Sequence, residues 1–250
     1  LKRVGQVIFA VVGSVTAVAG LLACGKLIER HLRSAPAFAA KTIEVQGASH
    51  YQNADVLRIA GLAVGQNVFA VGPEQAQAKL ESDPWIQRAT VTRRLPGTFR
   101  IEVSEHKAVA VLELDKLYLV GEDGQAFKPR EAGDPADLPI ITGLSPEDVA
   151  RDKQGSASQL LSAVALLHDY RDAGLSRREP VSEIHLEEDG SLSLYVGDDS
   201  TYVRLGKAPF RTKLRRLREV LTELAGKRAR AAYVYLDNER RSDRVTVRLR

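Results

Sequence analysis

Cysteine is almost absent from this 250-residue sequence, in which Cys24 is the only one. A single cysteine excludes an intrachain disulfide and any zinc site built on paired cysteines, so an oxidising compartment is permitted but not indicated. Aromatic residues are also few, at 6% of the chain against 44% for all hydrophobic residues. The composition is that of a globular protein whose core rests mainly on Val, Leu, Ile and Ala.

Motifs of catalytic and cofactor chemistry are missing as well. The five histidines are scattered without metal-ligand spacing. The sequence contains no Gly-x-Ser-x-Gly motif, no P-loop and no dinucleotide-binding fingerprint. We therefore expect no catalytic residue, no metal site, no cofactor and no small-molecule substrate, and the chain is not expected to be an enzyme.

Positive charge is concentrated at the end of the chain. Residues 204–250 hold 15 Lys/Arg and 5 Asp/Glu, a net charge of +10, whereas the whole chain carries only +4. A basic end can bind nucleic acid, anionic lipid or an acidic protein, or can simply be a solvated face. Aromatic residues do not alternate with the basic ones in residues 211–225, so we expect no nucleic-acid partner.

A long uncharged segment lies near the start, at residues 4–25. At 1.5 Å per residue a helix of this length extends about 33 Å, which is enough to cross a hydrocarbon core of about 30 Å. We predict a transmembrane helix at residues 4–28, after the remainder of a cytoplasmic tail at 1–3 and before a linker at 29–40. A cleaved signal peptide and a buried core helix are alternatives, and Leu21-Leu22-Ala23-Cys24 resembles a lipobox. Positive charges flank both ends and do not orient the span.

Residues 41–108 predict a first domain with the order β-α-α-β-β. The first helix is expected to use Asn53 as its N-cap and to stop at Gly61. Pro73 suits the first turn of the second helix, and Leu95-Pro96-Gly97-Thr98 suits a turn between strands. The predicted elements are a strand at 42–45, helices at 54–60 and 73–81, and strands at 85–91 and 99–103.

Short motifs in this domain resemble the POTRA domain of the FtsQ/DivIB family of cell division proteins. They are, in order, Val45-Gln46-Gly47, residues 61–67, Leu80 with Asp83-Pro84-Trp85-Ile86, residues 89–98 and residues 101–106. Each motif is weak alone, but the ordered set is specific. POTRA modules bind proteins, often by adding a strand to a sheet edge.

Residues 109–250 predict a β-rich domain with flanking helices, so the fold class is α+β. The main predicted elements are strands at 109–114, 117–120, 138–142, 184–186, 192–196 and 202–205, helices at 157–172 and 211–225, and a last strand from residue 244. This region also resembles the FtsQ/DivIB family, through Leu205, Gly206, Phe210, Lys213 and Leu214. It departs from the family at residues 234–238, Val-Tyr-Leu-Asp-Asn, where the family usually reads Ile-Asp-Leu-Arg-Tyr and the order Asp-Leu-Arg is lost.

The resemblance implies a non-enzymatic scaffold that links early and late cell-division proteins. It implies a single-pass protein of the cell inner membrane at the division septum, with a cytoplasmic N-terminus and a periplasmic C-terminal part. The implied partners are the extracytoplasmic segments of FtsB and FtsL, recruited by strand addition to the C-terminal sheet edge, together with other divisome membrane proteins. The partner-binding residues it suggests are Tyr233, Tyr235, Leu236, Arg244, Val245, Thr246, Val247, Arg248 and Leu249.

An alternative function is that of a POTRA-containing factor for protein translocation or outer-membrane assembly. Proteins of that class normally carry several POTRA modules, and this sequence shows one. The division hypothesis is therefore favoured.

Overall fold

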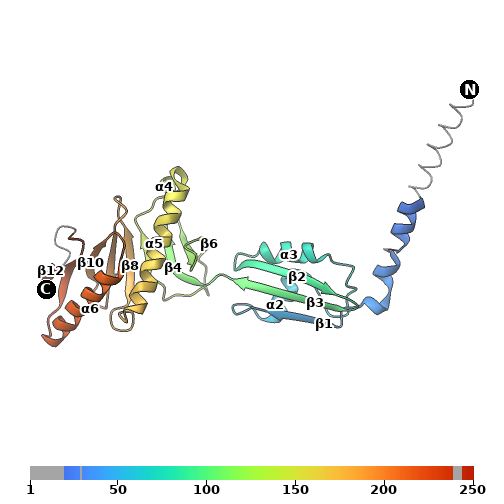
Figure 1. Ribbon diagram of the computed structural model, residues 1–250, viewed down its shortest axis with the longest axis horizontal. Coiled ribbons are helices and arrows are strands. Elements are labelled where there is room, and N and C mark those ends of the chain that lie inside the picture. The colour runs from blue at the N-terminus through green and yellow to red at the C-terminus, as the bar shows by residue number, and fades with distance from the viewer. Residues whose placement is uncertain (1–19, 29, 239–243) are drawn as a thin grey trace, which may run out of the picture. The chain divides into compact units, whose positions relative to one another are not determined.

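The computed structural model describes residues 20–28, 30–238 and 244–250 (Figure 1). The chain divides into two compact units between Glu105 and His106. The first unit and the second unit each have their own hydrophobic core.

The predicted membrane span at residues 4–28 lies largely outside the described residues. Residues 20–28 and 30–34 are helical. Within the part of the chain that the structure describes, no helix is both long enough and apolar enough to cross a membrane.

The first unit has the predicted order β-α-α-β-β. After a short 3₁₀ helix η1 (Pro36–Phe38), its elements are β1 (Thr42–Gln46), α2 (Asn53–Ala60), α3 (Pro73–Glu81), β2 (Ile86–Arg94) and β3 (Thr98–Glu105). The three strands form one sheet in the order β1-β3-β2, with β1 parallel and β2 antiparallel to β3. A parallel neighbour requires a crossover connection, which the segment containing α2, α3 and β2 provides.

One face of this sheet is buried under the two helices. Val56 of α2 and Leu80 of α3 are fully buried with Phe99 and Ile101 of β3. Pro73 begins α3 as predicted, and Gly61 ends α2 with a left-handed φ of 69°. The predicted N-cap was wrong: Asn53 is the first residue of α2, and Gln52 precedes it without a side-chain capping bond.

The second unit is built on a nine-stranded sheet. Its strands are β4 (Ala108–Glu113), β5 (Leu117–Gly121), β6 (Ala126–Pro129), β7 (Ile140–Thr142), β8 (Val181–Leu186), β9 (Leu192–Val196), β10 (Thr201–Gly206), β11 (Ala231–Tyr235) and β12 (Thr246–Leu249). They lie in the order β12-β11-β10-β9-β8-β7-β4-β5-β6, so the last strand of the chain is one edge of the sheet.

Three helices accompany this sheet: α4 (Pro146–Arg151), α5 (Lys153–Asp172) and α6 (Arg211–Gly226). Helix α5 begins before the predicted residue 157 because Asp152 caps it, accepting a hydrogen bond from the Gly155 amide. Helix α4 was not predicted, although its start carries a capping box formed by Ser145 and Asp148.

Helices α5 and α6 bury one face of the sheet. Alternate strand residues such as Leu194, Val203 and Val234 are completely buried and belong to the same core cluster as Leu166 of α5 and Leu214 of α6. Helix α6 is the crossover between the parallel strands β10 and β11. Leu214 and Leu217 of this helix are buried in the core and Leu221 and Leu224 pack against it, while its arginines lie on the outer side.

The carboxylate of Glu105, at the end of β3, holds the loop between β1 and α2. It accepts hydrogen bonds from the amides of Ser49 and His50 at 2.7 and 2.5 Å, from the Ser49 hydroxyl at 2.7 Å and from the Tyr51 amide at 3.2 Å. Burial alone would raise the pKa of Glu105, but these hydrogen bonds outweigh it and hold the pKa below its ordinary value.

We expect Glu105→Gln to destabilise the first unit by about 1 to 2 kcal/mol at neutral pH, after allowance for solvent screening of a partly exposed group. Because the folded-state pKa is lowered, the carboxylate stabilises fully above its ordinary pKa of 4.5, and this contribution is lost as pH falls through the lowered pKa. Trp85, the only tryptophan, lies in this unit, so urea unfolding followed by its fluorescence measures the effect.

The matched control is Glu44→Gln on the exposed side of β1, which should change the unfolding free energy by less than about 0.5 kcal/mol. Equal stability losses for the two variants would contradict the role of Glu105.

Candidate partner-binding edge

The free edge of the nine-stranded sheet is formed by β12, which pairs antiparallel with β11. Register pairs join Tyr233 to Arg248, Val234 to Val247 and Tyr235 to Thr246. The structure therefore brings eight of the nine predicted residues into or next to one strand pair, and the ninth, Arg244, lies just before β12 and is exposed.

Main-chain hydrogen bonds define which groups of β12 point away from the sheet. The amide of Arg250 donates to the carbonyl of Arg230, so the main-chain groups of Arg250 face β11. Because these groups alternate in direction along a strand, the main-chain groups of Arg248 and Thr246 face β11 as well. The amide of Leu236 donates to the carbonyl of Arg204 in β10. By the same alternation, the main-chain groups of Tyr235 and Tyr233 face β12. The N–H and C=O groups of Val247 and Leu249 are consequently those of the open edge.

The predicted residues divide between the two faces of the sheet. Val245 and Val247 are half-buried and pack against the core, whereas Tyr233, Tyr235 and Arg248 lie on the opposite face. Leu236 is buried, with 5% of its surface exposed. Leu236 thus supports the edge from inside and does not offer a contact surface.

A row of tyrosines crosses the outer face next to this edge. Ring centroids lie 5.4 Å apart for Tyr195 and Tyr202, 6.2 Å for Tyr202 and Tyr235, and 4.6 Å for Tyr233 and Tyr235. The guanidinium of Arg248 lies 5.9 Å from the Tyr233 ring. Tyr195 and Tyr202 were missed from the sequence, although both alternate with buried residues in strands that were predicted.

The tyrosine row continues into a hydrogen-bonded network on β9. The Tyr202 hydroxyl lies 2.9 Å from that of Ser193, which donates to the Glu187 carboxylate at 2.7 Å. Burial and the nearby Glu187 raise the pKa of Tyr202, partly opposed by the hydrogen bond with Ser193. The tyrosine is therefore a neutral phenol at physiological pH.

The opposite edge of the sheet, β6, is closed to further strands. It ends at Pro129, which has no N–H group to offer a further strand. The buried ammonium of Lys128 lies 2.9 Å from Asp134 and 3.3 Å from Glu131, which ties the following loop to this strand. A proline on an edge strand is one of the usual means of blunting that edge.

No group of three or more His, Cys, Asp or Glu side chains suited to a metal ion occurs among the described residues. The features that this region presents are main-chain groups at β12, an aromatic surface and positive charge.

Comparison with known families gives a match over each unit. The family model described as POTRA domain, FtsQ-type matches residues 38–106. The family model described as Cell division protein FtsQ/DivIB, C-terminal matches residues 108–238 and thus ends before β12.

Individual relatives agree with these matches. The chain is 32% identical to Cell division protein FtsQ of Myxococcus fulvus over 225 residues, which cover 90% of this chain and 78% of the relative. It is 29% identical to Cell division protein FtsQ of Geotalea daltonii, over 95% of this chain and 86% of the relative. It is 34% identical to Cell division protein FtsQ of an Anaeromyxobacter species, over 84% of this chain and 71% of the relative.

The buried position of Leu236 and the exposed position of Tyr235 predict different effects of alanine substitution on the free energy of unfolding. Leu236→Ala should lower the unfolding free energy of the second unit by about 2 to 4 kcal/mol because it leaves a cavity in the core. Tyr235→Ala, at a side chain that is 37% exposed, should cost less than about 1.5 kcal/mol. Urea unfolding followed by far-ultraviolet circular dichroism measures both, and a larger loss for Tyr235→Ala would contradict this assignment.

Proposed function

The chain belongs to the FtsQ/DivIB family of cell division proteins, and we propose that it acts in the divisome as a non-enzymatic scaffold that recruits FtsB and FtsL by strand addition at β12. The single observation that carries the mechanism is the open edge of β12. In this proposal a strand of the FtsB–FtsL complex continues the sheet beyond β12 and bonds the outward main-chain groups of Val247 and Leu249.

The contrast between the two sheet edges supports this choice. β12 contains no proline, and Val247 and the preceding Val245 pack against the core, whereas β6 ends in Pro129 beside the loop held by Lys128. Both strands are four residues long and both pairings contain a register shift, so the proline is the feature that separates the two edges. Of the two edges of this sheet, β12 is the one suited to a partner.

Charge supports an acidic partner segment. Arg244, Arg248 and Arg250 lie along or beside the edge, and all three are exposed. Positive charge at the rim accelerates association with an acidic partner and disfavours basic ones. The tyrosine row beside Arg248 adds the residue type that contributes most to protein interfaces.

The membrane part of the proposal rests on residues 4–28, through their uncharged sequence. We propose a single span in the inner membrane, with the N-terminus in the cytoplasm and both units in the periplasm at the septum. In that arrangement the protein presents β12 to the extracytoplasmic segments of other division proteins.

Replacement of an outward amide tests strand addition directly. Val247→Pro and Leu249→Pro remove N–H groups of the open edge without removing one that bonds β11. Each variant should weaken binding to an immobilised extracytoplasmic FtsB–FtsL complex by about fivefold or more. The loss is expected because one hydrogen bond to the added strand is missing and the proline ring clashes with that strand. Titration by surface plasmon resonance measures the dissociation constant.

Val247→Ala is the matched control, because it removes more of the buried side chain than Val247→Pro does but keeps the N–H group. Binding should then stay within about twofold of the unmodified protein. Both proline variants should unfold at the same urea concentration as the unmodified protein. If they do so and still bind the complex with unchanged affinity, strand addition at β12 is refuted, while the proposed role in division remains.

The division role has its own test, depletion of the protein in its host. Filamentous cells without septa are expected if the protein acts in the divisome. Loss of outer-membrane proteins with normal septation would instead support the alternative function in translocation or outer-membrane assembly. Microscopy and immunoblotting of membrane fractions distinguish the two results.

A further inference from the structure

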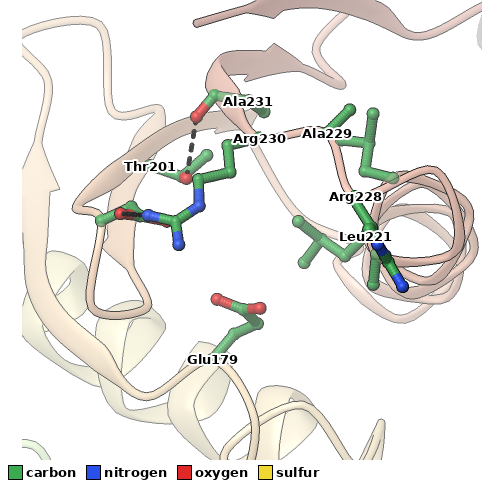
Figure 2. A pocket seen from close by; sticks show the side chains of 10 residues that line it. Glu179, Thr201, Leu221, Arg228, Ala229, Arg230 and Ala231 are labelled. Atoms are coloured by element: carbon green, nitrogen blue, oxygen red, sulfur yellow. Dashed lines mark hydrogen bonds and ion pairs between the residues drawn. The ribbon is translucent and has the colours of Figure 1, made fainter.

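A pocket of about 310 Å³ opens in the second unit where α6 ends and the chain turns into β11 (Figure 2). The last turns of α6 contribute Leu221, Leu224 and Ala225, and the start of β11 contributes Ala231. Figure 2 shows the carboxylate of Glu179 directed into this space from the segment before β8. The pocket therefore combines aliphatic side chains with two carboxylates, those of Glu179 and Asp199, and with Arg228 and Arg230.

The position of Glu179 is well defined by its surroundings. Its amide donates to Leu175, and its carbonyl accepts a hydrogen bond of 2.7 Å from the buried Tyr170 hydroxyl. A Cβ atom added to Gly197 would lie only 2.0 Å from a carboxylate oxygen of Glu179, so any other residue at position 197 would clash with it. Gly197 also has a φ of 69°, in the left-handed region that favours glycine. A glycine at this turn thus leaves the room that the carboxylate occupies.

The carboxylate itself has no hydrogen bond or ion pair with any described residue. The neighbouring Asp199 is paired, because its carboxylate lies 2.6 Å from Arg230. Arg230 is therefore already neutralised, and neither it nor Arg228, the other cation that lines the pocket, forms an ion pair with Glu179 in the described chain. Glu179 is a half-buried acid without a partner.

An unpaired acid in this position lowers the stability of the folded protein. Burial, together with the negative charges of Asp198 and Asp199, raises the pKa of Glu179 above its ordinary value. The pKa of Glu179 is higher in the folded state than in the unfolded state. The folded protein therefore loses stability as pH rises from the ordinary pKa through the raised pKa, and the ionised carboxylate is destabilising at neutral pH. A residue that costs stability without an internal contact is expected to act on something outside the chain.

The surroundings specify the charge and shape of what would bind. The C-terminal end of α6 carries the negative end of the helix dipole, which adds to the attraction of Glu179 for a cation. The leucine and alanine side chains suit an aliphatic stem of the kind that lysine and arginine carry behind their charge. Arg228, which also lines the pocket, would repel a second positive charge.

We propose that this pocket binds the cationic side chain of another polypeptide, with Glu179 pairing the charge and Leu221 and Leu224 covering the aliphatic stem. A lysine fits a site with a single free carboxylate. A free diamine fits less well, because its second ammonium group would lie near the positive charge of Arg228. The site is separate from strand addition at β12, and either can fail without the other.

The test uses the full chain with labelled leucine methyl groups, and the probe is N-acetyl-lysinamide. Methyl resonances of Leu221 and Leu224 should shift saturably with this probe, whereas N-acetyl-norleucinamide, which has the stem without the ammonium group, should have a much smaller effect. Glu179→Gln should weaken binding of the lysine probe about tenfold, as expected for loss of a charge pair. Glu113→Gln, at an exposed position on β4, is the matched control and should leave binding unchanged.

Stability supplies a second measurement on the same variants. Glu179→Gln should shift urea unfolding to a higher concentration at neutral pH, so a loss of binding cannot be attributed to unfolding. Equal binding of the lysine probe by the Glu179→Gln variant, or the absence of saturable shifts at both leucines, would overturn the proposal. Tighter binding of cadaverine than of N-acetyl-lysinamide would assign the pocket to free diamines and overturn the polypeptide occupant.

Discussion

The parallel pairing of β10 with β11 constrains the whole C-terminal half of the second unit. Parallel neighbours cannot be joined by a tight turn, so the chain must cross a face of the sheet between them, and α6 is that crossing. Leu214 and Leu217 bury α6 against the sheet and leave its arginines outside. Strand β11 is then bonded to β10 on one side, and the returning strand β12 can only be added outside it, at the edge.

Most elements of this fold could be predicted because their signals are local. Alternation in β3 and β10, the leucine spacing of α6, and Gly61 and Pro73 at helix ends each depend on a few neighbouring residues. The failures were also local. Gln52 precedes α2 without a capping bond, and the six-residue α4 is too short to show a periodic pattern despite the capping box at Ser145. Neither error altered the predicted order of the main elements.

The candidate edge was less predictable because it depends on register. Tyr195 and Tyr202 lie far before Tyr235 in sequence, and only the pairing of β9, β10 and β11 brings their rings together. Leu236 was expected to contact a partner, yet the residue that follows β11 turns into the core. Burial of one residue at a strand end is decided by tertiary packing, which sequence alternation alone does not encode.

The blunted strand β6 has a consequence for stoichiometry. A sheet that was open at both ends could accept a strand at each, and copies could then propagate through shared partners into an unlimited ribbon. With Pro129 and the loop that Lys128 ties down at one end, β12 is the edge of this sheet left for pairing. If strand addition occurs as proposed, each copy of the protein would accept one partner strand, and further growth would depend on the partner.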